Sequence, residues 1–592
     1  DLINDKSEQS GYYMNFSLDV DIIKNMLSAK VLYGLNKENT SRDSYIPSDV
    51  YYALQRKSRG NLGYGKRQQS TLEGTLTFQH KFGELLDMNL MAGMGRYLDS
   101  GDGSDISYEN ANDHIQGSSV GMADGPFYPT SYKYKNEKRS QFVRGSFDLF
   151  GRYVVSASLR RDGTDKFFPS KKYAFFPSVS LAWKMNEESF IKNISWINML
   201  KLRASYGETG SDNLGTTLYG IVTTAREDVQ FNNNSVTYIP YILSGANYED
   251  VTWQKTVMKN IGLDFSIFRD RIWGSVDVFR NDVTHLLGTA PTELLGMHGT
   301  RPINGGHYKR TGVDVSLNSL NLQTHDFKWT SQITMSHYNA VWIERMPNYD
   351  YQKYQKRKNE PMNAFYYYKT TDIIDVDKSN MPESQRSLGP AACMPGYPIV
   401  EDKNGDGIID VNDSYMDNML PKLYFGFGNT FTWKNFDLDI FMYGQLGVKK
   451  WNDAYSYSAD AGNLSRGVDA HNVGIYSYNI WNTQTNMNGH FPGIAISKSV
   501  ALPENLGFDY TRENASYVRV RNITLGYNLG PKELSIFKGY IRGIRVFVDF
   551  QNPLTFTKYK GYDPEINTSS SNLTGGQYPQ MRVYSIGAKL TF

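Results

Sequence analysis

The residues best suited to chemistry in this sequence lie in an aspartate-rich loop between positions 402 and 413. The segment fits the calcium-loop pattern D-x-[DN]-x-[DN]-G, with Gly407 at the sharp turn. Its predicted oxygen ligands, at loop positions 1, 3, 5, 7, 9 and 12, are Asp402, Asn404, Asp406, the Ile408 carbonyl, Asp410 and Asp413. Asp413 replaces the usual glutamate, which weakens the predicted site. The alternative is an Asp/Asn/Gly turn whose side chains cap their own backbone.

A second candidate is the aromatic run at Tyr366, Tyr367 and Tyr368. Aromatic faces bind the apolar faces of sugars, so these residues are candidate ligand contacts. The alternative is a loop core or a protein interface, because aromatic residues are enriched at interfaces.

Several functional classes are excluded by the composition and the motifs. We find no zinc-protease, P-loop or nucleophile-elbow motif, so no catalytic residues and no enzyme activity are predicted. A single cysteine, Cys393, forms neither an internal disulfide nor a thiolate cluster. The formal net charge of +2 over 592 residues gives no electrostatic case for nucleic acid binding. No apolar run approaches the roughly 18 to 20 residues of a membrane helix.

The elements that must position these residues are β-strands, because apolar and polar residues alternate along the whole chain. In the final segment the residues of the apolar face are Tyr584, Ile586, Ala588, Leu590 and Phe592. Segments of about ten residues suit strands that cross a membrane at a tilt. The pattern predicts about 17 such strands, over 14–23, 28–36, 70–82, 86–97, 140–150, 152–161, 174–186, 199–208, 257–268, 272–283, 307–318, 326–338, 421–433, 436–446, 515–529, 542–552 and 581–592.

The predicted connections alternate between tight turns and long loops, which is typical of an outer-membrane β-barrel. The long loops cover 98–139, 209–256, 339–420 and 447–514, and the calcium-like loop falls in the third. A soluble propeller or sandwich array is the alternative, but no repeat of about 40 to 50 residues supports it. We therefore predict an all-β, antiparallel transmembrane barrel over 1–592, with 339–420 and 447–514 as long extracellular loops.

The predicted strand number has a consequence for the barrel. Short turns face the periplasm in such barrels, and single-chain bacterial barrels usually have an even number of strands. If the last strand ends at the periplasm, the first of seventeen strands also runs inward. It then starts outside the cell and not in the periplasm. An odd number of strands is therefore expected before Asp1 or from another chain.

Four stretches resemble one family closely. They are Ser158–Phe167 with Tyr173–Trp183, Leu200–Asn213, Ser516–Tyr527 and Gln551–Glu565. In this order they resemble the C-terminal half and more of the SusC/RagA family, TonB-dependent transporters of the Bacteroidetes outer membrane. The resemblance extends from about residue 10 to 592.

The resemblance implies a 22-stranded barrel with an N-terminal plug, seated in outer-membrane lipid and covered by a SusD-like surface lipoprotein. It implies import of a large nutrient, an oligosaccharide or a peptide, powered by the TonB complex through an N-terminal region absent from this sequence. The plug is also absent, so a fragment and one half of a split barrel both remain open. The alternative function is a SusC-like barrel serving as a structural subunit of a larger outer-membrane assembly or secretion complex.

Overall fold

The computed structural model describes the chain from residue 3 to residue 591 with internal gaps. The residues outside the described ranges are 1–2, 49–56, 111–119, 215–222, 226–230, 234–235, 239–240, 244–248, 292–299, 348–350, 357–358, 453–478, 490, 494–501, 511, 532, 538–539, 562, 567–578 and 592. Much of the predicted loop 447–514 and part of 339–420 therefore lie outside the described residues.

One 17-stranded sheet dominates the structure, which confirms the predicted all-β architecture and strand number. Its strands are β1 (Asn4–Ile23), β2 (Leu27–Ile46), β3 (Arg59–Phe82), β4 (Leu86–Glu109), β5 (Phe127–Leu149), β6 (Tyr153–Thr164), β7 (Tyr173–Lys184), β8 (Ile197–Ser211), β13 (Gln254–Ile267), β14 (Ile272–Pro291), β15 (Thr300–Gln323), β16 (Phe327–Glu344), β21 (Leu423–Trp433), β22 (Phe436–Leu446), β26 (Tyr517–Leu529), β27 (Gly543–Thr557) and β28 (Val583–Thr591).

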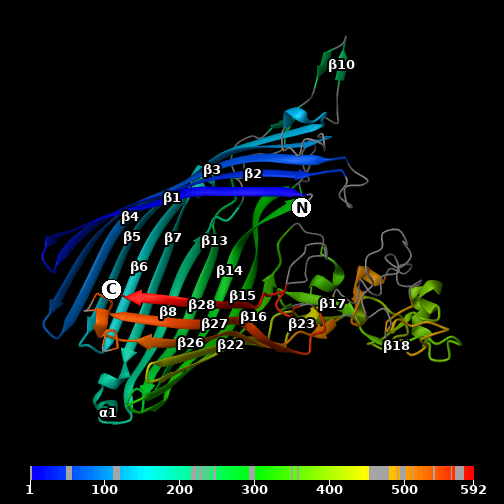
Figure 1. The fold of residues 1–592 in the computed structure, drawn as a ribbon. Coiled ribbons are helices and arrows are strands. Elements are labelled where there is room, and N and C mark those ends of the chain that lie inside the picture. The colour runs from blue at the N-terminus through cyan, green and yellow to red at the C-terminus, as the bar shows by residue number, and fades with distance from the viewer. Residues whose placement is uncertain are drawn as a thin grey trace.

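Each strand of this sheet pairs antiparallel with the barrel strand that follows it in the chain. The sheet is therefore a simple meander that curves round on itself, with β1 and β28 at its two edges (Figure 1). The strict up-and-down order is the connectivity expected of a membrane barrel.

The two faces of the sheet differ in chemistry. On one face lie large apolar side chains such as Met94, Ile261 and Val278, which are 66%, 62% and 57% exposed. The opposite face carries cross-strand charge pairs, such as Arg203 with Asp277. Side chains on the convex side of a curved sheet spread apart and are therefore more exposed than those on the concave side. We accordingly assign the highly exposed apolar face to the outside of the barrel and the charged face to the lumen.

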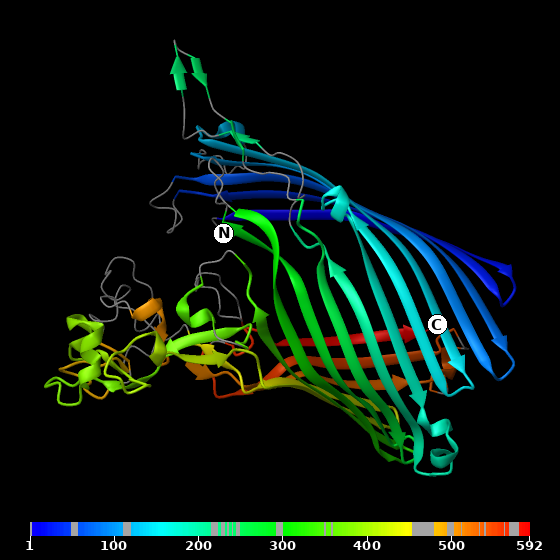
Figure 2. The same ribbon diagram turned by 180° about the vertical axis from the view of Figure 1, so that it is seen from behind.

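The connections segregate by length to the two ends of the sheet, as predicted. At one end, β1–β2, β3–β4, β5–β6, β13–β14, β15–β16 and β21–β22 are joined by two to four residues. The β7–β8 connection at this end is longer and holds η5 (Met185–Glu187) and α1 (Ser189–Lys192), which lie at the end of the sheet away from β17 (Figure 2). The β26–β27 connection at this end, 530–542, is also longer. The longest connections leave from the other end, which we call the loop end.

Strand length is where the sequence prediction was wrong. The region 98–139 was predicted as a loop, but β4 and β5 stay paired out to Tyr108 and Phe127. Likewise β1 and β3 begin ten or more residues before their predicted starts. These extensions are polar, so they give no apolar alternation, yet the backbone ladder continues because its hydrogen bonds do not depend on side-chain polarity.

The remaining elements are short and lie mainly in the connections at the loop end. The short strands are β9 (Thr223–Ala225), β10 (Phe231–Asn233), β11 (Val236–Tyr238), β12 (Tyr241–Leu243), β17 (Ala364–Tyr368), β18 (Thr370–Ile373), β19 (Pro398–Val400), β20 (Tyr415–Asn418), β23 (Lys449–Trp451), β24 (Gly507–Phe508) and β25 (Arg512–Asn514). The 3-10 helices besides η5 are η3 (Val120–Met122), η4 (Pro169–Lys171), η6 (Lys353–Lys356), η7 (Glu383–Leu388), η8 (Pro390–Cys393), η9 (Val411–Asp413), η11 (Pro503–Asn505) and η12 (Ser535–Phe537).

Segments of two separate connections form a single packed unit beyond the loop end. The β17 strand pairs antiparallel with β20 and parallel with β24, which belongs to the later connection. We call the described parts of 345–422 and 502–515 the loop body; it projects from the ends of the barrel strands in both views (Figure 1, Figure 2). Among the described helices, none combines the length and hydropathy needed to cross a bilayer.

A charge placed in the middle of the outward face should destabilise the barrel. Leu90 lies on this face, in register with Phe78 and Gly145. We expect Leu90→Arg to lower the free energy of unfolding in lipid vesicles by about 2–4 kcal/mol, the usual cost of arginine at the bilayer midplane. The control is Asn89→Arg on the adjacent, lumen-facing position, which should change stability little. Equal losses in both variants would contradict the assignment of the two faces.

Candidate functional site

The aspartate-rich loop folds as a series of side-chain-to-backbone turns. The Asp402 carboxylate accepts the N–H groups of Gly405 and Gly407 at 2.8 and 2.9 Å. The Asn404 side-chain oxygen accepts the Asp406 N–H, and Asp406 accepts the Ile408 N–H at 2.8 Å. Gly407 has φ +84°, a conformation that favours glycine. These turns are expected of a calcium loop and of a self-capped turn alike, so they do not distinguish the two alternatives.

Asp413 has a different role from the one expected at loop position 12. Its side chain is fully buried, and one oxygen accepts the N–H groups of Lys403 and Asn404 while the other accepts that of Asp410. Together with Asp410 it forms a capping box around η9. Because both oxygens already accept backbone donors, Asp413 closes the loop and does not fit a bidentate metal ligand in this arrangement.

Calcium therefore stays a prediction that rests on the first half of the loop. The oxygen donors of Asp402, Asn404 and Asp406 fit a hard cation chemically. Across the described residues, however, no group of three or more His, Cys, Asp or Glu side chains is arranged to hold a metal ion. Ile409 is buried, whereas Ile408 is 57% exposed.

The three tyrosines lie inside the loop body. Tyr366 and Tyr367 are each 7% exposed, and Tyr368 is fully buried. Tyr366 donates to Glu360, and Tyr367 donates to Asp417 at 3.2 Å. This burial favours the loop-core alternative, since covered rings offer no face to a ligand. Contact with a ligand stays a prediction.

The structure brings the tyrosine run and the aspartate-rich loop together. The Tyr368 hydroxyl donates to the Asp410 carbonyl at 3.0 Å. Its ring packs with Val400, Ile409 and Leu502 in one apolar cluster. Burial therefore raises the pKa of Tyr368 far above its ordinary value. The cluster joins residues of two connections, so it decides the internal structure of the loop body.

Asp417 is the polar centre of the same body. Arg512 donates to its carboxylate at 2.6 Å and Lys449 at 3.1 Å. The Arg512 guanidinium also lies 4.7 Å from the ring centres of both Phe365 and Tyr367. Burial and the neighbouring Asp417 carboxylate raise the pKa of Tyr367 to about 12, so this hydroxyl remains a donor at physiological pH.

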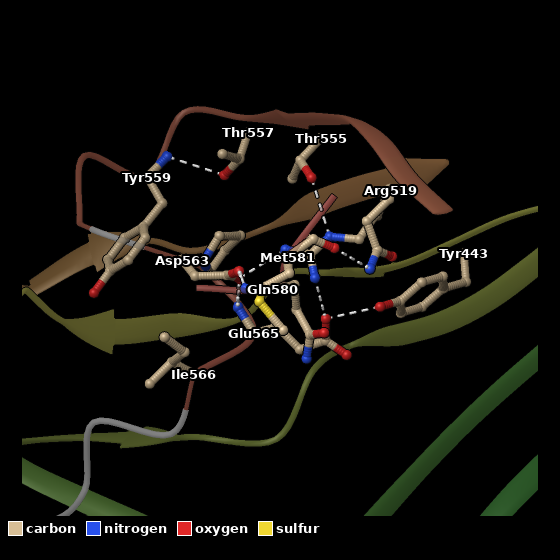
Figure 3. Close-up of polar contacts among 12 residues, drawn as sticks. Tyr443, Arg519, Thr555, Thr557, Tyr559, Asp563, Glu565, Ile566, Gln580 and Met581 are labelled. Carbon is tan, nitrogen blue, oxygen red and sulfur yellow. Dashed lines mark hydrogen bonds and ion pairs between the residues drawn. The ribbon is translucent and has the colours of Figure 1, made fainter. Parts of the chain in front are cut away.

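A buried arginine attaches the last long connection to the barrel (Figure 3). Arg519, on β26, is 2% exposed and lies between Asp563 and Glu565 of the segment after β27. Its guanidinium donates to Asp563 at 2.7 Å, to Glu565 at 2.5 Å and to Thr555 at 3.0 Å. Tyr443, on β22, completes the network with a 2.7 Å hydrogen bond to Glu565. We call these residues the arginine latch.

Asp563 also binds the backbone of the last long connection. It accepts the N–H groups of Glu565 and Gln580 at 2.9 and 3.0 Å, so it holds both ends of the connection (Figure 3). Burial opposes ionisation, but these N–H groups and Arg519 outweigh it and hold the pKa of Asp563 below its ordinary value of 3.8. The resulting stability is present above pH 3.8 and is lost as the pH falls through the lowered pKa.

The latch residues were not among the sequence-predicted sites. A signal was present, because Arg519 and the pair Asp563 and Glu565 lie in two of the stretches that carry the family resemblance. What the sequence lacked was the contact between the two stretches, in which Arg519 and Asp563 are 44 residues apart in the chain.

The lumen face is lined by paired charges. Arg203 on β8 donates to Asp264 on β13 at 2.7 Å and to Asp277 on β14 at 3.1 Å. Across the sheet, Arg545 on β27 donates to Asp437 on β22. Such a surface is polar and carries charges of both signs, as does the polar interior of membrane barrels.

The calcium prediction is tested by titration calorimetry on the purified protein. We expect Ca²⁺ to bind with heat, and Asp402→Asn/Asp406→Asn to remove the binding because two carboxylate ligands are lost. Asp375→Asn, an exposed position in the same connection, is the control and should bind as the wild type does. No heat and no Ca²⁺-dependent rise in melting temperature for the wild type would refute the site.

Loss of the arginine latch should release the last connection. Arg519→Met leaves the Asp563 carboxylate buried without its cation, which typically costs about 3–5 kcal/mol. We expect faster hydrogen exchange at the amides of Glu565 and Gln580, measured by mass spectrometry. The control is Arg521→Met, because Arg521 makes one 3.3 Å hydrogen bond to Asn552 and is exposed. Unchanged exchange in Arg519→Met would contradict the assigned role.

Comparison with known proteins agrees with this architecture. The chain is 26% identical over 628 aligned residues to TonB-dependent receptor P3 of Formosa agariphila, covering 99% of this chain and 58% of that relative. It is 27% identical over 487 residues to TonB-dependent receptor SusC of Bacteroides thetaiotaomicron, covering 78% of this chain and 44% of SusC. The chain thus spans about half the length of the curated relatives it matches.

Among solved structures, the RagAB peptide transporter aligns over 100% of this chain and 63% of the matched chain. The TM-score is 0.79 and the sequence identity is 20%, which establishes a shared fold. The resemblance to SusC/RagA proteins is thereby confirmed. The TonB dependent receptor-like, beta-barrel family matches residues 1–552, and the chain therefore belongs to this outer-membrane family.

Proposed function

We propose that this chain forms the barrel of a TonB-dependent importer of SusC/RagA type. The importer takes up a large nutrient, an oligosaccharide or a peptide, across the outer membrane. The observation that carries the proposal is the division of the sheet into an apolar outward face and a charge-paired lumen face, in a chain of this family. A hydrated lumen suits a polar solute that is too large for general porins.

In the proposed importer, the residues of the lumen face line the passage through which the solute moves. Arg203, Asp264 and Asp277 hold one another across three neighbouring strands, so these charges stay fixed to the wall. A fixed wall leaves the passage open to water and offers polar groups to a passing solute. The relative in the solved structure is described as a peptide transporter, which supports a peptide as one candidate cargo.

The proposed partners follow from the same relatives. A SusD-like surface lipoprotein covers the loop end and holds the ligand there, and the TonB complex supplies energy from the inner membrane. The loop body and the arginine latch support this arrangement because they give the loop end a fixed shape against which a partner can close. The proposal assigns no catalysis to the chain.

Uptake by a deletion strain tests the proposal. We expect deletion of the gene to abolish growth on at least one member of a panel of oligosaccharides and peptides, and the wild-type gene to restore it. Growth on the corresponding monomers should be unchanged, because monomers pass through porins. An uncoupler of the proton-motive force should block uptake of the same ligand without preventing its binding at the surface.

The alternative, a structural subunit of a larger outer-membrane assembly, predicts a different result. The deletion strain would then grow normally on the whole panel. A larger complex, visible on native gels of wild-type outer membranes, would be lost in the deletion strain. That pair of outcomes would overturn the import proposal.

A further inference from the structure

Three arginines lie together on the outward face of the barrel, which is otherwise apolar over much of its height. Arg96 on β4 is in register with Arg139 on β5, and Arg161 on β6 is in register with Gln141, the next outward residue of β5. The apolar residues of the same face on these strands include Met94, Val143 and Leu159. Charged side chains on a lipid-facing surface are costly unless they reach a polar partner.

The internal partners of these arginines leave part of their charge unbalanced. Glu137 accepts two hydrogen bonds from Arg96, at 3.0 and 2.8 Å, and one from Arg139 at 2.6 Å. Arg161 donates to the neutral side-chain oxygen of Gln141 at 3.0 Å. Two guanidinium groups therefore share one carboxylate, while the third, that of Arg161, donates to a neutral oxygen. Arg96 and Arg139 remain 56% and 58% exposed, so their outer N–H groups are accessible.

Arg161 is held in a fixed orientation by an aromatic ring. Its guanidinium carbon lies 3.9 Å from the centre of the Tyr173 ring. That ring lies directly against Gly163, where a Cβ atom would be 2.3 Å from a ring carbon. The missing side chain at Gly163 thus makes room for the ring, and the ring orients the guanidinium by cation–π contact. Arginine held in this way presents a planar set of donors that matches the oxygens of a phosphate group.

A groove begins at these arginines and continues over apolar residues. Its charged part, about 520 Å³, is lined by Arg96, Arg139, Arg161 and Tyr173, with Leu72, Gly74 and Met94 beside them. An adjoining groove of about 710 Å³ shares Gly74, Met94 and Arg161 and extends over Leu76, Val143, Leu159 and Phe175. Gly74 lines both grooves, and the open space where its side chain would stand deepens the surface at the point where they meet. The surface is therefore amphipathic, with cationic and apolar parts in contact.

The height of the arginines agrees with the edge of a bilayer. Arg96 lies ten residues after Leu86, the first residue of β4 at the short-turn end. Ten residues span about 33 Å along a strand, or about 25 Å across the membrane at a tilt of about 40°. This equals the usual height of the apolar band of such barrels, about 25 Å. Arg96 thus lies at headgroup level on the loop end, with Arg139 in register beside it and Arg161 slightly deeper, and the apolar groove extends from them into the bilayer.

We propose that Arg96, Arg139 and Arg161 form a binding site for a phosphorylated glycolipid of the membrane leaflet at the loop end. The arginines bind the phosphates of the headgroup, and the groove over Met94, Val143, Leu159 and Phe175 takes its acyl chains. The apolar continuation favours a lipid over a soluble anion, and the unbalanced positive charge favours a phosphate-bearing headgroup over a neutral one. This inference concerns the lipid-facing wall and does not depend on the proposed transport.

Native mass spectrometry of the intact protein, purified from outer membranes in mild detergent and delipidated, tests the site. The probes are diphosphorylated lipid A, the same lipid after enzymatic removal of its phosphates, and inorganic phosphate. We expect the diphosphorylated lipid to be retained at least tenfold more than the dephosphorylated one. Equal retention of both lipids by the wild type would overturn the proposal without any variant. Displacement of the lipid by equimolar inorganic phosphate would show a simple anion site and would also overturn it.

Substitutions locate the binding on the barrel wall. Arg96→Gln/Arg139→Gln/Arg161→Gln should abolish the preference for the phosphorylated lipid. The matched control is Arg67→Gln/Arg144→Gln/Arg160→Gln, which removes arginines from the lumen-facing positions of β3, β5 and β6 and should keep the preference. Heat-modifiable migration on gels checks that each variant is a folded barrel. A preference that survives the first substitution set, or disappears only with the second, would refute the assignment.

Discussion

The structure depends on one constraint, the need of every backbone N–H and C=O group in a membrane to find a partner within the protein. The sheet meets this need by pairing each barrel strand with its neighbours in the chain, from β1 to β28. Within the described residues, β1 pairs with β2 alone and β28 pairs with β27 alone. Lipid offers no hydrogen bonds to such an edge, so both edges need further strands in a bilayer.

The same constraint sorts the side chains. A paired strand turns successive residues to opposite faces, so the lipid side takes Met94, Ile261 and Val278 and the lumen side takes Arg203 with its two aspartates. Outward arginines are tolerated at Arg96, Arg139 and Arg161 because these positions lie at the edge of the apolar band. A charged lumen face and an apolar outward face are thus two results of one alternating pattern.

Outside the bilayer the source of order changes. The loop body is held by a small apolar cluster around Tyr368 and by the ion pairs of Asp417, and the last connection is held by Arg519. A buried arginine with two carboxylates is costly to assemble and strongly destabilised when one partner is removed, so it specifies one geometry. Segments that are long in sequence thus become fixed surfaces at the loop end of the barrel.

The sequence by itself determined the number and order of the barrel strands, because the alternation of apolar and polar residues is visible within about ten residues. It also determined the family, through the four stretches that resemble SusC/RagA proteins. It did not determine where strands such as β4 and β5 end, because polar extensions pair without any alternation signal. Nor did it show that Tyr366, Tyr367 and Tyr368 are buried, or that Asp413 closes its own loop. Only the tertiary structure decided these points, since burial and pairing depend on residues brought together from distant segments, as Arg519 and Asp563 are.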